Sequence, residues 1–180
     1  PVALAQDIDL NLPPNGRSSI VAGDIDNGSS DNCGTVSLSL SQADFNLDNL
    51  GVNNIVLTVD DGNGNSSTAD AAVNVIAHPI YFDSLALVDF YIQTNGQDWS
   101  NNENWLIGDI SSWFGVSITN DRVTGVNLSS NNLAGEITEN FNELDALTTV
   151  DLSNNGIEAI STNLSNLTGI TTFTISGNNL

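Results

Sequence analysis

The stretch VTGVNLSSNNL at residues 123–133 returns as LTTVDLSNNGI at 147–157 and as ITTFTISGNNL at 170–180. In each copy the first, fourth, sixth and eleventh positions are apolar and the ninth is Asn. The copies begin about 24 residues apart, which is the length of one strand and one return segment in a repeat protein. One such coil cannot bury its own apolar face, so the pattern predicts stacked coils with a shared core.

The recurring Asn is predicted to point inward with the apolar residues. It occurs at Asn131, Asn155 and Asn178. A buried amide without partners costs about 1–3 kcal/mol. The sequence therefore predicts that these side chains bond to the backbone of neighbouring coils.

The segment before the repeats combines a helical pattern with aromatic residues. In DSLALVDFYIQTNG, Asp83 is predicted as the N-cap and Gly96 as the residue that ends the helix, while Leu85, Val88 and Ile92 form an apolar stripe. Trp99, Trp105 and Trp113 follow. We expect these rings to seal the open end of the repeat core rather than to form a sugar-stacking platform.

The first 76 residues show the alternation of half-buried strands. Ile8, Leu10 and Leu12 alternate with polar residues, and similar runs lie near 36–40, 55–59 and 69–75. Asn15-Gly16 predicts a hairpin after which RSSIV returns antiparallel. Short strands between Gly, Asn and Asp turns predict a sandwich with no helix.

Two family resemblances follow from these motifs. VALAQDIDLNL, AGDIDNGSSDNCG and NNIVLTVDDGNGNSSTADAAVNV resemble a hyalin-type, immunoglobulin-like module of bacterial surface proteins. DFYIQTNGQDWSNNENWL, SSWFGV and LAGEITENFNELDAL resemble the amino-terminal cap and return segment of leucine-rich repeat proteins. The cysteines of some relatives are missing: Leu47 and Ala69 stand in two of their places, and Cys33 is the single cysteine.

The resemblances imply a fold class of two domains, an all-β immunoglobulin-like sandwich followed by a leucine-rich repeat solenoid with a helical amino-terminal cap. The expected boundaries are 1–76 for the sandwich, 77–82 for a linker, 83–122 for the cap and 123–180 for three repeats, the last incomplete.

Two turns are rich in oxygen ligands and are candidates for calcium, which takes six to eight oxygens in loose geometry. The same residues also open β-turns without any metal, and both interpretations stay open. The candidate ligands are Asp24, Asp26, Asn27 and Asp31 in the first turn, with Asp60, Asp61, Asn63 and Asn65 in the second.

In leucine-rich repeat proteins the strands line a concave face, and the resemblance places small polar residues there. Such a face suits a protein or glycan ligand, or it is an unused face with consensus residues. The candidates are Thr124, Asn127, Ser129, Thr148, Thr149, Asp151, Ser153, Thr171, Thr172, Thr174 and Ser176.

Charge and residue types exclude several function classes. The 22 acidic residues face only Arg17 and Arg122, for a net charge of -20, which disfavours nucleic acid as a partner. No apolar run is long enough for direct membrane insertion. His78 is the single histidine, and the chain has no phosphate loop or zinc motif. We therefore expect no catalytic residues, no enzyme activity and no required cofactor, with calcium as the one candidate ion.

These observations predict a secreted or cell-surface module of a larger bacterial protein, acting outside the cell in adhesion or recognition. Its partner would be a protein or a polysaccharide bound by the repeats. The alternative is a structural spacer or a self-assembling filament subunit stiffened by calcium, whose partners are copies of itself.

Overall fold

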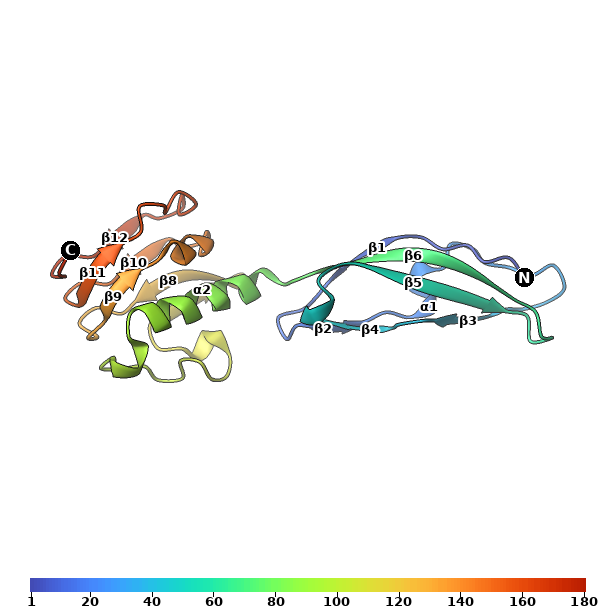
Figure 1. Ribbon diagram of the computed structural model, residues 1–180, viewed down its shortest axis with the longest axis horizontal. Helices are drawn as coiled ribbons and strands as arrows, with labels where there is room; N and C mark the ends of the chain where they lie inside the picture. Colours follow the sequence, from blue (N-terminus) through green and yellow to red (C-terminus); the bar gives the residue numbers. More distant parts are fainter. The chain divides into compact units, whose positions relative to one another are not determined.

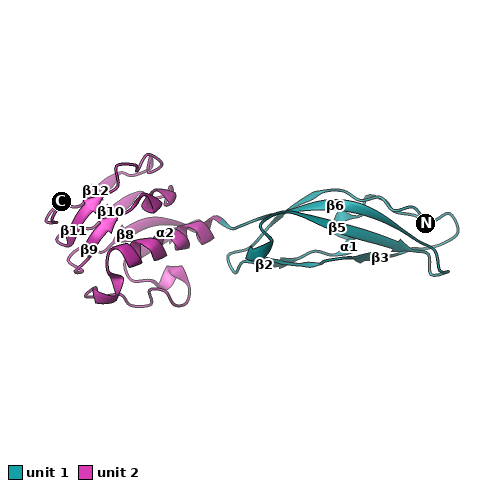
Figure 2. Cartoon of the chain, in the orientation of Figure 1, with its two compact units in different colours: residues 1–78 teal, residues 79–180 magenta.

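The computed structural model describes all residues, 1–180, and the chain divides into two compact units, Pro1–His78 and Pro79–Leu180 (Figure 2). Each unit is built around its own buried apolar cluster.

Unit 1 consists of short strands, two long strands and two brief helical turns (Figure 1). The elements are β1 (Ile8–Asn11), β2 (Arg17–Ser19), α1 (Ala22–Ile25), β3 (Ser37–Leu40), β4 (Asp44–Asn46), the 3-10 turn η1 (Leu47–Asn49), β5 (Gly51–Asp60) and β6 (Ser66–Ile76).

The main sheet of unit 1 has the order β1-β6-β5-β3. Its centre is the β5–β6 hairpin, paired antiparallel from Gly51↔Val75 to Asp60↔Ser66. Alternate residues of both strands point inward, and Leu57 and Val73 are fully buried. A separate ribbon of β2 and β4 contributes Phe45, which is 2% exposed, to the same core.

The prediction of a β-hairpin at Asn15-Gly16 is wrong. The turn forms, with Gly16 N–H donating to the Pro13 carbonyl, but the strands on its two sides join different sheets. β1 lies parallel to β6, and β2 pairs antiparallel with β4. A local turn signal specifies a reversal of direction and leaves the partner strands to tertiary packing.

The expected fold class is also wrong. In unit 1, β1 and β6 pair in parallel, the layer opposite the main sheet holds only the three-residue strands β2 and β4, and one α-helical turn occurs where no helix was expected. This is not an immunoglobulin-like sandwich. In unit 2 the sheet is mixed rather than a regular solenoid wall, since antiparallel β7 precedes the parallel strands. Alternation predicts strands, but their pairing depends on contacts distant in sequence.

Unit 2 has one long helix, short strands and 3-10 turns (Figure 1). Its elements are α2 (Pro79–Gln93), η2 (Gly96–Asp98), η3 (Ile110–Ser112), β7 (Val116–Thr119), β8 (Arg122–Asn127), β9 (Ala134–Ile137), η4 (Glu139–Glu143), β10 (Thr149–Asp151), β11 (Gly156–Ile160) and β12 (Thr172–Thr174).

The three sequence copies lie side by side in register. Val126 pairs with Val150, which pairs with Phe173, so β8, β10 and β12 run parallel in one sheet of order β12-β10-β8-β7. Behind it, β9 and β11 form a second parallel pair. The matching apolar positions Leu128 and Leu152 are 1% and 0% exposed. The repeat period thus brings equivalent residues together, as parallel stacking requires.

Asn155 joins two coils through its side-chain amide. Its Oδ1 accepts from the N–H groups of Asn131 at 2.8 Å and Leu133 at 3.0 Å. Its Nδ2 donates to the carbonyls of Leu128 and Leu152, both at 2.9 Å. One side chain therefore satisfies backbone groups that the turn after each strand leaves without partners.

The other two asparagines repeat this arrangement. Asn131 Oδ1 accepts from Asn101 N–H at 2.7 Å, and Asn178 Oδ1 accepts from Ile157 N–H at 2.9 Å. Asn178 Nδ2 also donates to the Ile175 carbonyl at 2.8 Å. The predicted bonding of the inward asparagines to neighbouring backbone is confirmed.

Helix α2 differs from its prediction in bounds and orientation. It begins at Pro79, so residues 79–82, expected to be linker, form its first turn. Asp83 is not an N-cap: it lies inside the helix with a fully buried carboxylate. After Gln93 the chain turns at Asn95, whose φ of 59° takes the left-handed role expected for Gly96. With 15 residues, α2 is too short to cross a membrane, and no helix qualifies as a span.

The Asp83 carboxylate ties α2 to β8. Oδ1 and Oδ2 accept from Nη2 and Nε of Arg122 at 2.9 and 3.0 Å, and Oδ2 also accepts from Val123 N–H at 2.8 Å. Asp145 contacts the same guanidinium. The hydrogen bonds that its guanidinium donates to Asp83 are the main cause that raises the pKa of Arg122. The buried charge is thus fully compensated, as burial of a carboxylate requires.

The three tryptophans are buried against this helix. Trp99 and Trp105 meet edge to face with ring centroids 4.8 Å apart, Trp105 stacks with Tyr91, and Trp113 lies 4.9 Å from Trp105. Their exposures of 5–6% are those of core residues. The aromatic cluster closes the first end of the stacked coils instead of offering a sugar-binding platform.

Asn155→Ala should destabilise unit 2 by at least about 2 kcal/mol, because backbone groups of two coils lose their partners. Urea unfolding followed by tryptophan fluorescence measures this, since all three tryptophans lie in unit 2. Asn166→Ala, at an exposed position, is the matched control and should change stability by less than about 0.5 kcal/mol. Equal effects of the two substitutions would contradict the bonding role.

Asp83→Ala should cost at least about 2 kcal/mol of unit 2 stability, because the Val123 N–H loses its partner and the partly buried guanidinium of Arg122 keeps only the exposed carboxylate of Asp145. Asp145→Ala removes the other partner of Arg122. The Asp145 side chain is 55% exposed, so this substitution should cost less than about 1 kcal/mol. The same fluorescence-detected unfolding compares them. A larger loss for Asp145→Ala would show that the buried pair is not the dominant bond.

Candidate functional site

The sheet β12-β10-β8-β7 presents a polar face made of two rows of side chains. The rows follow from the register, in which Ser117, Gly125, Thr149 and Thr172 are successive partners, as are Asn127, Asp151 and Thr174. Neighbouring strands lie about 4.8 Å apart and alternate residues about 6.6 Å apart along a strand. We call these seven residues the hydroxyl face.

The first row is kept flat by Gly125. A Cβ at this position would lie 2.9 Å from Thr149 Oγ1 and 3.2 Å from Ser117 Cβ. The hydroxyl groups of Ser117 and Thr149 therefore flank a glycine, and both residues are exposed. Thr172 continues the row, also exposed.

The second row carries oriented oxygen atoms. Asp151 Oδ1 accepts from Ser153 N–H at 3.0 Å and from Ser153 Oγ at 2.7 Å. Asn127 Oδ1 accepts from Ser129 N–H at 3.4 Å and from its Oγ at 3.3 Å. These bonds engage one oxygen of each side chain. Ser153 was expected on the exposed face but is only 8% exposed. Through its two hydrogen bonds it orients Asp151.

Three other expected face residues bond along the stack instead. Thr148 Oγ1 donates to the Thr124 carbonyl at 2.9 Å, and Thr171 Oγ1 donates to the Thr148 carbonyl at 3.0 Å. Thr124 Oγ1 lies 3.2 Å from Thr119 Oγ1. These threonines form a hydroxyl-to-carbonyl ladder beside the rows. Ser176 is exposed beyond the strands, and its carbonyl accepts from Asn154 N–H.

Two residues of this sheet, Ser117 and Thr119, were not among the predicted face residues, because β7 lies in the segment that was expected to be the cap. A signal was present. Val116 and Ile118 alternate with them, and Asn120-Asp121 joins β7 to β8 with φ of 50° and 56°. Two left-handed residues between alternating runs are typical of a type I′ hairpin.

The candidate calcium turns do not converge into a metal centre. Nowhere in the structure do three or more His, Cys, Asp or Glu side chains group as metal ligands. Asp26 Oδ1 accepts from Ser29 N–H, and Asp61 Oδ1 accepts from the N–H groups of Asn63 and Asn65. The carboxylates therefore stabilise their own turns, the alternative left open by the sequence. Asp24 Oδ2 accepts from Val21 N–H, Asp31 Oδ2 from Cys33 N–H, and Asp60 Oδ1 from Gly62 N–H in the same way.

Hydrogen bonds lower the pKa of these turn carboxylates. The pKa of Asp61 lies below its usual 3.8, chiefly because the Asn65 side chain donates to it. The pKa of Asp26 is lowered mainly by Ser29, and that of Asp31 mainly by the Cys33 N–H. Bonds to the ionised form favour that form.

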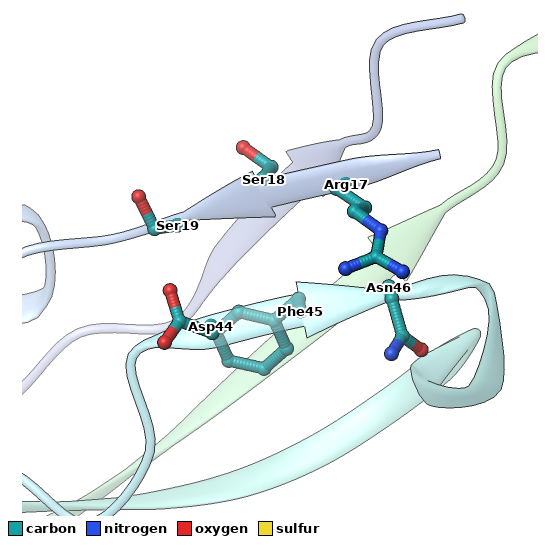
Figure 3. A pocket seen from close by; sticks show the side chains of 6 residues that line it. All are labelled: Arg17, Ser18, Ser19, Asp44, Phe45 and Asn46. Atoms are coloured by element: carbon teal, nitrogen blue, oxygen red, sulfur yellow. The ribbon is translucent and has the colours of Figure 1, made fainter. Parts of the chain in front are cut away.

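Unit 1 also has an open hollow of about 390 Å³ along the β2–β4 ribbon. Its lining was not predicted as a site. Figure 3 shows the Arg17 side chain reaching from β2 toward Asn46 of β4, while Ser19 and Asp44 lie at the other end. One cation, Arg17, and one anion, Asp44, thus lie with hydroxyl and amide groups on an open, shallow surface.

No family model and no curated protein matches this sequence. Solved structures that resemble it include a leucine-rich repeat protein from Bacteroides eggerthii DSM 20697, with 27% identity over 44% of this chain and 13% of that chain and a TM-score of 0.38. Another is a leucine-rich repeat protein from Bacteroides thetaiotaomicron VPI-5482, with 14% identity over 62% of this chain and 18% of that chain and a TM-score of 0.37. The chain spans less than a fifth of either neighbour. Neither similarity concerns a hyalin-type module, and TM-scores this low do not establish a shared overall fold.

Asp61→Asn should lower the melting temperature of unit 1 most at neutral pH. Because the folded-state pKa of Asp61 lies below 3.8, its stabilisation is present above the unfolded value and is lost as pH falls through the folded pKa. The gap between wild type and variant, measured by circular dichroism from pH 7 to 2.5, should therefore close below pH 3.8. Asp70→Asn, at an exposed position of β6, is the control. A gap that stays constant with pH would contradict the role of the ionised carboxylate.

Proposed function

We propose that this chain is a non-catalytic recognition module of the leucine-rich repeat type, acting outside a bacterial cell or on its surface. Its ligand would be a polysaccharide, bound by the hydroxyl face. The observation that supports this is the register of small hydroxyl, amide and carboxylate side chains in two rows across four strands.

The chemistry of the hydroxyl face suits a sugar chain better than a protein surface. Serine and threonine hydroxyls both donate and accept, as sugar hydroxyls do. Protein-binding hot spots are rich in Trp, Tyr and Arg, and the seven residues include none of these. Hydroxyls carried on strands about 4.8 Å apart, with Gly125 between those of Ser117 and Thr149, can hydrogen-bond several groups of an extended ligand at once.

Charge narrows the class of polysaccharide. Asp151 lies within the second row, and the chain carries a net charge of -20. An anionic polymer would be repelled, whereas a neutral or cationic one would not. The proposed ligand is therefore a neutral or amino-sugar polysaccharide.

The same residues argue against catalysis on this face. The rows contain hydroxyls but no histidine, and Asp151 is their single carboxylate. A hydroxyl nucleophile needs an adjacent base, and glycoside hydrolysis ordinarily needs two carboxyl groups. Recognition without turnover is the chemistry that remains.

The test is binding of the full chain to a panel of immobilised neutral, amino-sugar and acidic polysaccharides. Thr149→Val with Thr172→Val removes two hydroxyls while keeping side-chain shape, and should weaken the bound polysaccharide at least tenfold. Thr58→Val with Thr68→Val changes another cross-strand threonine pair, in unit 1, and should leave binding unchanged. Loss of binding in both double variants, or binding of none of the polysaccharides, would refute the proposal.

A further inference from the structure

Helix α2 is apolar on two opposite faces. One face packs into the core through Ile80, Ala86, Leu87 and Phe90, each at most 8% exposed. The other face leaves Phe82, Leu85 and Ile92 at 49%, 48% and 62% exposure. Leu85 and Ile92 belong to the stripe that the sequence predicted to be buried. A helix that is apolar all round is ordinarily covered on every side.

The three exposed apolar residues lie on one face of the helix, with Asp89 between Leu85 and Ile92. Positions 82, 85, 89 and 92 follow the spacing that places side chains on one helix face. They extend over about 15 Å along the axis, close to three turns. That is long enough to hold the apolar face of one partner helix. We call Phe82, Leu85 and Ile92 the α2 stripe.

Acidic groups border the α2 stripe. Asp89 lies within it, and its Oδ2 accepts from Thr138 Oγ1 at 2.6 Å, which brings the start of η4 beside the helix. Glu139 and Glu143, at the two ends of η4, are exposed. Arg122 is the only Lys or Arg in unit 2, and it is bound to Asp83 and Asp145. The carboxylates that border the stripe therefore have no lysine or arginine of unit 2 to neutralise them.

We infer that the α2 stripe binds a basic amphipathic helix of a partner protein. Its apolar residues would cover Phe82, Leu85 and Ile92, and its lysines or arginines would meet Asp89 and the glutamates of η4. A second copy of this chain fits less well, because each copy brings a net charge of -20. An anionic lipid surface would be repelled for the same reason. No residue of the hydroxyl face lies on α2, so this inference stands apart from the proposed function.

The experiment uses the full chain and a labelled 15-residue peptide of leucine and lysine with leucines at helical spacing. A shuffled peptide of the same composition has no apolar face and is the peptide control. Fluorescence anisotropy at 0.15 M salt should show binding of the amphipathic peptide at least tenfold tighter than that of the shuffled one. Leu85→Ser with Ile92→Ser should remove this preference, whereas Val52→Ser, a 70% exposed site of unit 1, should preserve it.

Each other outcome overturns the inference. Equal binding of the two peptides would mean attraction by net charge alone. Unchanged binding by the Leu85 and Ile92 double variant would place the peptide elsewhere. A concentration-dependent dimer in sedimentation, abolished by the same variant, would assign the stripe to a second copy.

A second double variant tests the acidic rim independently of α2 folding. Glu139→Gln with Glu143→Gln keeps every apolar contact and should weaken peptide binding severalfold.

Discussion

The structure of unit 2 depends on one hydrogen-bonded side-chain amide per coil. A short strand followed by a tight turn leaves N–H and carbonyl groups pointing at the core, where unpaired groups are costly. The side chains of Asn131, Asn155 and Asn178 supply both a donor and an acceptor at that point. Asn155 and Asn178 each bond to backbone in their own coil and in the one before it, and Asn131 bonds to the backbone of Asn101 before the first coil. The position of one coil therefore determines that of the next. The same bonds align β8, β10 and β12, and this alignment places the polar side chains of the hydroxyl face in rows.

The periodic pattern of the repeats predicted which side chains point inward. The nine-residue segment from Val123 to Asn131 was sufficient for this, because the same inward positions recur wherever coils stack. It did not identify β7, which joins the sheet through an Asn-Asp turn and belongs to no repeat. In α2 the heptad-like spacing of Leu85 and Ile92 suggested the wrong buried face, since both faces are apolar and packing against η4 and β8 decides between them. Asp83 shows the same limit, because its partner Arg122 is distant in sequence.

Unit 1 shows more plainly why pairing is harder to predict than strand content. The alternating runs that contain β1, β3, β5 and β6 were all recognised, yet β1 lies beside β6 rather than beside β2. Asp7 accepts from Ala72 N–H, and Asp9 accepts from the Asn74 amide, so polar groups distant in sequence help to select the parallel neighbour. The acidic turns illustrate a related ambiguity. Asp61 carries a carboxylate of the kind that binds calcium. In the folded chain, however, its Oδ1 already accepts hydrogen bonds from the N–H groups of Asn63 and Asn65.

The ion pairs of Arg122 with Asp83 and Asp145 have a consequence for proteolysis. A trypsin-like protease needs an extended basic side chain in its specificity pocket, and this chain has no lysine and only two arginines. Arg122 lies within β8 with its guanidinium held by Asp83 and Asp145, so its peptide bond is closed to such an enzyme while unit 2 stays folded. Arg17, on the short exposed strand β2, is left as the single tryptic target. The scarcity of basic residues thus limits trypsin-like cleavage of the folded chain to Arg17.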